Sequence, residues 1–193
     1  MKIFQIYYKN DLMQITDKIY ELNYFSPLIY KDISSKGKIF IERVKFLINF
    51  YKNNPGIYIA SLKSLLSKIP SKENLFKNIY KIQTKTEIKI KNFESKLIRL
   101  GYEQTTRVTL PGEFTIKSDI IDIYSFNKPE PIRISLYGDT IKEIKYFNPL
   151  TQLNKGNSIE EFNIIPKKEI IWNNENINKL KNHIKENEYK KLI

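Results

Sequence analysis

The sequence predicts an α/β protein in which a parallel α/β layer is interrupted by an inserted, β-rich α+β domain. In residues 1–75, short β-branched and aromatic runs alternate with helical patterns, which is typical of a parallel sheet with helical crossovers. In residues 76–163 the pattern changes to amphipathic strands separated by turn residues. An apolar strand and a final helix then predict a return to the first layer. Residues 1–75 with 164–193 are therefore one predicted domain, and residues 76–163 are the other.

The first layer is predicted from apolar runs bounded by caps and chain breaks. Its predicted strands are three β-branched and aromatic runs, Lys2–Tyr8, Ser26–Tyr30 and Ile57–Ala60. Its predicted helices have apolar residues at helical spacing and cover about 11–22, 39–52, 62–68 and the end of the chain from 174. Asn10 or Asp11 is expected to cap the first helix, Gly37 to break the chain before the second, and Ser61 to cap the third. Trp172 is expected to be a packing anchor.

The inserted domain is predicted to hold one helix and several strands. The helix covers Lys89–Leu100, with Gly101 placed to end it. Gly138-Asp139 lies between two alternating runs and is a strong two-residue hairpin signal. The predicted strands are Ile79–Ile88, a pair within Arg107–Phe126, a pair within Pro131–Phe147, and Phe162–Ile165, which Pro166 closes.

One face of the second strand pair carries charge and an aromatic ring. Ile132, Ile134 and Leu136 alternate with Arg133, Ser135 and Tyr137, so the two sets point to opposite sides of a strand. On such a strand Arg133 and Tyr137 lie roughly 13 Å apart. Lys117 joins them if the neighbouring strands bring it to the same face. Cations with an aromatic ring are typical of interface anchors, although such residues also simply solubilise the open side of an antiparallel sheet.

The composition leaves little for catalysis. The chain has no cysteine, which excludes disulfides, a thiol nucleophile and a cysteine zinc site. His183 is the only histidine, which excludes an H-E-x-x-H metal site and leaves a Ser-His-Asp triad without support. Neither G-x-x-x-x-G-K-[ST] nor G-x-G-x-x-G occurs, so no cofactor is expected. Asp119 and Asp122 are three apart and point to opposite faces of a strand, so we expect a turn residue and a strand-end residue.

The net charge of +12 favours a second function class, a nucleic-acid-binding domain without sequence specificity. Arginine occurs only at Arg43, Arg99, Arg107 and Arg133, and lysine is scattered along the chain. That distribution is more typical of an AT-rich genome than of a basic stripe built for nucleic acid. The first residues lack the features of a signal peptide, and no apolar run is long enough for a membrane span. A cytoplasmic protein without a membrane partner is expected.

An ordered set of motifs resembles the UvrB-like N-terminal module of the bacterial transcription-repair coupling factors, the Mfd family. The motifs run in the family's order over nearly the whole chain. They are PGIYIAS at 55–61, GYE at 101–103, PGEFTIK at 111–117, IDIY at 121–124, PIR at 131–133, LYGD at 136–139 and IIPKKE at 164–169. Short pieces of this set are weakly specific, and the ordered set is strongly specific.

The resemblance implies a degenerate helicase-like layer, P-loop NTPase-like but without the P-loop, and an inserted domain similar to the second domain of UvrB. In this family that domain binds UvrA, the damage-recognition ATPase of nucleotide excision repair, and has no catalytic activity. The family's full-length members are ATP-dependent DNA translocases whose other domains bind RNA polymerase and double-stranded DNA. In them a C-terminal domain masks the UvrA-binding face until activation. The chain is therefore expected to be a recruitment module and not an enzyme.

The resemblance also assigns the interface residues. The family's UvrA contacts correspond to Lys117, Arg133 and Tyr137, which are the residues that the alternation places on one face. Arg133 is expected to pair with a carboxylate of UvrA, Tyr137 to be the desolvated anchor and Lys117 to steer association. Lys117 stands where the family has arginine, and Ser118 stands where it has glycine. A lysine keeps the charge but loses the planar fork of a guanidinium.

Overall fold

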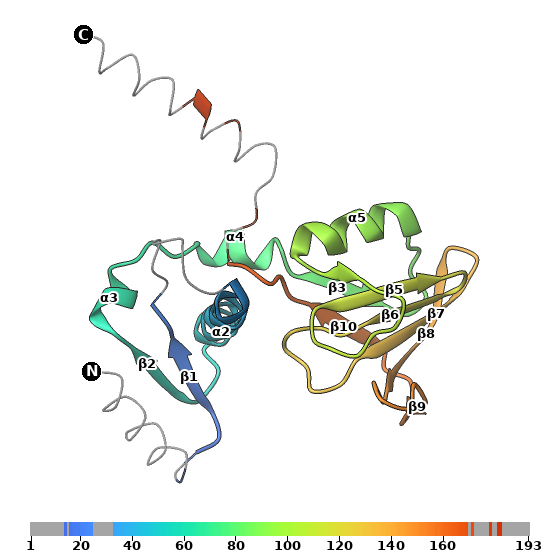
Figure 1. Ribbon diagram of the computed structural model, residues 1–193, viewed down its shortest axis with the longest axis horizontal. Helices are drawn as coiled ribbons and strands as arrows, with labels where there is room; N and C mark the ends of the chain where they lie inside the picture. Colours follow the sequence, from blue (N-terminus) through green and yellow to red (C-terminus); the bar gives the residue numbers. More distant parts are fainter. Residues whose placement is uncertain are drawn as a thin grey trace.

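The computed structural model describes residues 14, 16–24, 33–169, 171, 178 and 181–182 (Figure 1). The predicted strands Lys2–Tyr8 and Ser26–Tyr30 lie outside these residues, as do Trp172, His183 and most of the predicted last helix. A small α/β lobe and a larger β-rich lobe lie side by side, with α4 (Lys72–Phe76) between them (Figure 1). Among the described residues, no helix has the length and apolar content that a membrane span requires.

The small lobe is a parallel strand pair packed against one long helix. β1 (Ile19–Leu22) runs parallel to β2 (Ile57–Ala60), with Ile19 opposite Ile57 and Leu22 opposite Ala60. Of these two strands the sequence predicts only Ile57–Ala60, and the wider parallel layer stays a prediction. The helix α2 (Ile33–Tyr51) covers the pair, and α3 (Leu62–Leu65) follows β2. The core of this lobe contains Leu22, Phe46, Leu47 and Leu75.

Three predictions for this lobe are wrong. Ile19–Leu22 is a strand and not the end of a helix, because its β-branched and aromatic residues pair with β2. Gly37 does not break the chain; α2 begins at Ile33 and continues through it. Glycine costs about 1 kcal/mol inside a helix, which the packing of a 19-residue helix overrides. The third helix is shorter than expected, although Ser61 caps it as predicted, and Ser71 caps the unpredicted α4.

The larger lobe is built on a six-stranded sheet with the strand order β4-β5-β6-β7-β8-β9. Its strands are β4 (Glu103–Gln104), β5 (Glu113–Lys117), β6 (Ile120–Ile123), β7 (Ile132–Tyr137), β8 (Thr140–Phe147) and β9 (Asn154–Lys155). Strands β5 to β9 are successively antiparallel. The predicted hairpin is confirmed, with Gly138 and Asp139 in the turn between β7 and β8 and Gly138 at φ +57°.

The second sheet and the helix of this lobe largely follow the prediction. β3 (Tyr80–Gln83) pairs antiparallel with β10 (Glu161–Ile164). The predicted strand Ile79–Ile88 is shorter than expected because a turn follows Gln83, with Lys85 at φ +65°. The helix α5 (Ile90–Leu100) starts within one residue of its predicted start. It ends as expected at Gly101, which adopts the left-handed conformation at φ +93°.

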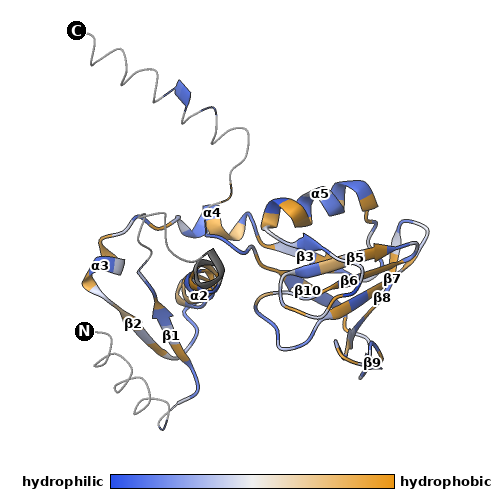
Figure 2. Ribbon diagram, viewed as in Figure 1, coloured by the Kyte–Doolittle hydropathy of each residue, from blue (hydrophilic) through white to orange (hydrophobic). Residues whose placement is uncertain are grey.

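One face of the six-stranded sheet is closed by the main core. Its inward side chains pack with α5, whose apolar and polar sides are distinct in Figure 2. The fully buried members from the sheet are Phe114, Ile121, Ile123, Ile132, Ile134 and Ile144, each at 0% exposure. Val44 of α2 belongs to the same core. The opposite face of the sheet is therefore the one available for other contacts.

The segment after β10 joins the two lobes. The Lys167 amide donates to the Leu100 carbonyl (2.8 Å), which ties the segment to α5. Two residues later, Glu169 accepts a hydrogen bond from Nε of Arg43 at 2.9 Å. Arg43 is 1% exposed and lies on α2. The chain thus returns from the β-rich lobe to α2, as the predicted insertion requires, whereas the domain limits at 75/76 and 163/164 stay a prediction.

Candidate protein-interaction face

The candidate site is the side of the six-stranded sheet that faces away from the core, called here the outer face. Cross-strand register places its residues in rows across β5, β6 and β7. The outer face includes Thr115, Lys117, Ile120, Asp122, Arg133, Ser135 and Tyr137, and the register extends it to Glu143 and Lys145 of β8. In β7 the predicted alternation is confirmed: Ile132, Ile134 and Leu136 are buried, and the three intervening residues are more exposed.

Tyr137 has the most exposed ring among the described large hydrophobic residues, at 82%. It is the last residue of β7, next to the hairpin turn and opposite Thr140. The register between β7 and β8 shifts between Ser135 and Leu136, a bulge that locally increases strand twist. Burial of the Tyr137 ring by a partner protein would therefore be energetically favourable.

Lys117 is exposed and ends β5, one row from Tyr137. Its row across the sheet continues through Ile120 to Ser135. The following Ser118 has a φ of +48°, in the left-handed region that favours glycine. This explains why glycine suits that position in the resembling family. Lys117 and Tyr137 therefore share the open end of the outer face.

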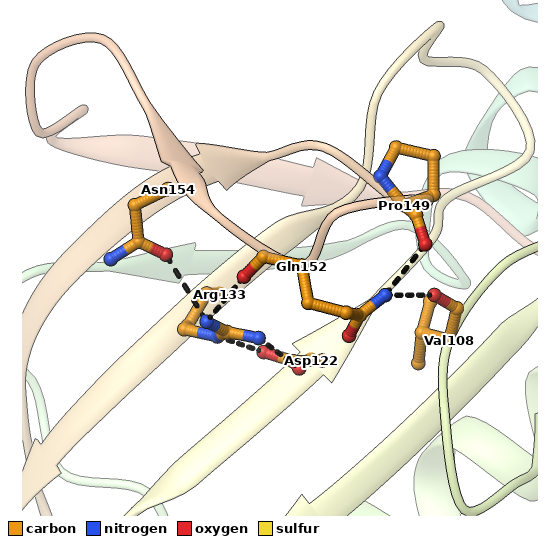
Figure 3. Close-up of polar contacts among 6 residues, drawn as sticks. All are labelled: Val108, Asp122, Arg133, Pro149, Gln152 and Asn154. Atoms are coloured by element: carbon orange, nitrogen blue, oxygen red, sulfur yellow. Dashed lines mark hydrogen bonds and ion pairs between the residues drawn. The ribbon is translucent and has the colours of Figure 1, made fainter.

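Arg133 is not free, because its carboxylate partner lies in the same chain (Figure 3). Its Nε and Nη2 donate to the two carboxylate oxygens of Asp122, both at 2.8 Å. Nη1 donates to the Gln152 carbonyl (3.1 Å) and to Oδ1 of Asn154 (3.3 Å). The guanidinium also lies 4.8 Å from the ring centre of Phe147. The hydrogen bonds that Arg133 donates to Asp122 raise the pKa of Arg133, against the opposing effect of burial.

The predictions for Arg133 and Asp122 need correction in this respect. The Arg133 side chain is only 20% exposed, so it is mostly buried and does not project freely into solvent. Asp122 is buried in β6 directly opposite Arg133, and it is not a strand-end residue. Asp119 is an exposed turn residue as expected. The pairing follows from strand register: opposite charges directly across an antiparallel pair meet at close range.

Two loops close the Arg133 end of the outer face (Figure 3). Nε2 of Gln152 donates to the carbonyls of Val108 (3.1 Å) and Pro149 (2.7 Å). Arg107 also donates to the Leu150 carbonyl. These bonds join the 105–112 loop to the 148–153 loop. Val108 and Phe147 are 0% exposed as a result.

Sequence reasoning missed Asp122, Gln152 and Asn154 as members of the site. The cross-strand charge pair of Asp122 with Arg133 could have been found from register, had the pairing of β6 with β7 been fixed in advance. Gln152 and Asn154 carry no local signal for the site, since their bonds to Arg133 and Val108 span 19 to 44 positions.

Two cavities lined by residues of both lobes lie next to each other. The first has a volume of about 420 Å³, and the second of about 280 Å³. Both are bordered by Ile48, Lys52, Asn127 and Ile165. The first cavity is also lined by Lys45, Glu21 and Glu42, and the second by Lys128 and Glu161, so both linings carry charges of both signs. Within the part of the chain that the structure describes, no three His, Cys, Asp or Glu side chains are grouped closely enough to hold a metal ion.

The sequence is similar to a known domain family and to known bacterial proteins. Residues 80–170 match the family described as the UvrB interaction domain. Over 185 residues the chain is 64% identical to the transcription-repair-coupling factor of Borreliella burgdorferi, covering 96% of this chain and 16% of that protein. It is 28% identical over 179 residues to the transcription-repair-coupling factor of Staphylococcus aureus, covering 92% of this chain and 15% of that protein. The chain therefore spans about a sixth of the length of these curated relatives.

Proposed function

We propose that this chain, which belongs to the bacterial transcription-repair coupling factor family, is a non-catalytic module that recruits UvrA during nucleotide excision repair through its outer face. The match of residues 80–170 to the UvrB interaction domain supports the partner class. DNA translocation and contact with RNA polymerase belong, in this proposal, to the parts of the full-length protein beyond this chain. A domain elsewhere in that protein covers the outer face until the partner is needed.

The observation that carries the proposal is the exposure of Tyr137 beside Lys117. The ring is 82% exposed, and it sits on a strand whose other face is locked into the core. Burying an aromatic side chain of this size yields about 1.5–3 kcal/mol. Because the strand is already fixed, little conformational entropy is lost when a partner covers the ring.

The two exposed residues have different roles. Tyr137 fills an apolar pocket on UvrA and controls the dissociation rate. Lys117 remains at the edge of the contact, where its charge attracts an acidic surface and raises the association rate at low salt. Asp122 balances the charge of Arg133, so Lys117 supplies the unpaired positive charge of this pair of strand ends. The surface that complements this face is therefore acidic around one apolar pocket.

Calorimetric titration of UvrA with single variants tests the proposal. Tyr137→Ala is expected to weaken binding more than 10-fold, and Lys117→Ala to slow association mainly at low salt. The matched control is Ile98→Ala on α5, a helix that packs on the other side of the sheet. Ile98 is 55% exposed, so its truncation should leave affinity unchanged. Wild-type protein that does not bind UvrA, or an unchanged affinity for both outer-face variants, would refute the proposal.

A second function is favoured by the charge of +12 and by the lysines that border the cavities between the lobes. It is sequence-independent binding of nucleic acid. Counterion-driven contacts of a few lysines weaken strongly by roughly 200 mM salt. A gel shift with double-stranded DNA at that ionic strength separates the two functions, because retained binding favours the nucleic-acid function and its loss favours UvrA recruitment.

A further inference from the structure

We infer that Arg133 is an internal clamp, and that the 148–153 loop it holds presents Leu150 and Leu153 as a second contact area for the same partner. The inference rests on the proposed function for the identity of the partner. It extends the proposed interface from the open end of the outer face to the end that the two loops close. It also gives Arg133 a positioning role, different from that of a side chain exposed for direct pairing.

The Arg133 side chain uses most of its hydrogen-bond donors within its own chain. A guanidinium has five N–H donors. Two of them meet Asp122 at 2.8 Å, and two meet the Gln152 carbonyl and Asn154 at 3.1 and 3.3 Å. One N–H remains for a partner, on a side chain that is 20% exposed. A partner's carboxylate could form a bidentate pair only by displacing Asp122 or one of the two Nη1 bonds, so most donors of Arg133 hold its own chain together.

Hydrogen bonds within and around the 148–153 loop hold it in one conformation. Oδ1 of Asn148 accepts the amides of Leu150 (2.8 Å) and Thr151 (3.1 Å), which closes a tight turn. Gln152 and Arg107 join this turn to the 105–112 loop. Gln152 has a φ of +64°, a conformation that non-glycine residues adopt only when surrounding contacts enforce it. Arg133 supplies one of those contacts by bonding the Gln152 carbonyl.

The 148–153 loop exposes two leucine side chains to solvent. Leu150 is 78% exposed and Leu153 is 69% exposed. Leu110, on the loop bonded to it, is 63% exposed. A single exposed leucine needs no explanation, but here three stand on two loops that hydrogen bonds join to each other. Apolar side chains on preordered loops bind with a small entropy loss.

The occupant is the UvrA surface of the proposed function, because Arg133 belongs to the outer face and is bonded to the loop at the same time. The loop therefore continues the proposed interface without a gap in the hydrogen-bonded network (Figure 3). The partner's surface then needs an apolar area for the leucines in addition to the acidic surface and pocket that receive Lys117 and Tyr137.

The variant Arg133→Lys tests whether Arg133 holds the 148–153 loop in place or contacts UvrA directly. Lysine keeps the positive charge but cannot reproduce the four fork-shaped bonds. The clamp predicts at least 10-fold weaker UvrA binding and faster hydrogen exchange at the amides of Leu150 and Leu153. Asp122→Asn keeps the shape and should speed exchange at the same amides. Wild-type affinity for Arg133→Lys, or unchanged exchange in both variants, would overturn the clamp.

The paired substitution Leu150→Ser with Leu153→Ser tests the contact area itself. Both side chains are solvent-exposed, so the melting temperature should stay the same while UvrA affinity falls about 10-fold. Leu62→Ser, on α3 and 73% exposed, is the matched control and should bind like wild type. Unchanged binding of the paired variant, with Tyr137→Ala still defective, overturns this inference and leaves the proposed function intact. A wild-type protein that does not bind UvrA overturns both.

Discussion

The two ends of the outer face differ although the same strand alternation produces them. At the open end, Lys117 and Tyr137 project from strand ends into solvent. At the closed end, Arg133 lies in an ion pair under a loop, with Phe147 fully buried beneath it. Alternation therefore determines which side of a sheet a residue occupies, and the loops determine whether that side meets water.

This contrast implies that buried and exposed side chains of the face contribute differently to stability. Substitutions of the buried residues at the closed end should change the free energy of unfolding more than substitutions of the exposed residues at the open end. Four substitutions test the contrast, two at each end, with effects that decrease from the first to the last.

The largest effect is expected from Phe147→Ala. Removing a fully buried ring leaves a cavity, which costs about 3–5 kcal/mol of unfolding free energy. Tyr137→Ala is the matched aromatic truncation at the open end and should change stability by less than about 0.5 kcal/mol. Urea unfolding monitored by circular dichroism measures both. Similar losses for the two variants would contradict the division of the face into two ends.

Asp122→Ala comes next. It leaves the half-buried guanidinium of Arg133 without its bidentate partner, and we expect a loss of about 2–3 kcal/mol in unfolding free energy. The double variant with Arg133→Met should recover part of this loss, because no unpaired charge then remains. A double-mutant cycle from thermal unfolding gives the coupling energy. A coupling near zero would mean that the ion pair does not hold the loop.

Ser118→Gly is expected to stabilise the open end. Serine at φ +48° pays a steric cost that glycine avoids, so unfolding free energy should rise by about 0.5–1 kcal/mol. The control is Ser135→Gly inside β7, where glycine should destabilise by a similar amount. Differential scanning calorimetry resolves shifts of this size. A lower melting temperature for Ser118→Gly would show that its side chain has a compensating role.

Lys117→Arg has the smallest expected effect. An exposed charge pair contributes at most about 1 kcal/mol, and the planar fork of arginine improves on lysine by a fraction of this. UvrA affinity should therefore rise by a factor of about two to three, with stability unchanged. Surface plasmon resonance at two salt concentrations measures it. A weaker complex would indicate that the partner surface fits the lysine specifically.

Much of the larger lobe could be predicted because its signals are local. Gly101 ends α5, the Gly138-Asp139 turn joins β7 to β8, and the alternation in β7 sorts its side chains between core and outer face. In the small lobe, local signals misled at Ile19–Leu22, whose strand form depends on pairing with β2. Gly37 misled as well, because packing keeps α2 continuous there.

The amino-acid sequence by itself determined a mixed α/β fold, the family resemblance and the alternation that places Arg133 and Tyr137 on one side of β7. These properties depend on residue spacing along short segments, which period-2 geometry and turn chemistry convert directly into structure. Only the tertiary structure decided that Arg133 is enclosed while Tyr137 stays open. That outcome depends on Asp122 from a neighbouring strand and on a loop nearly 20 residues away. Contacts between residues far apart in the sequence cannot be inferred from residue spacing along the chain.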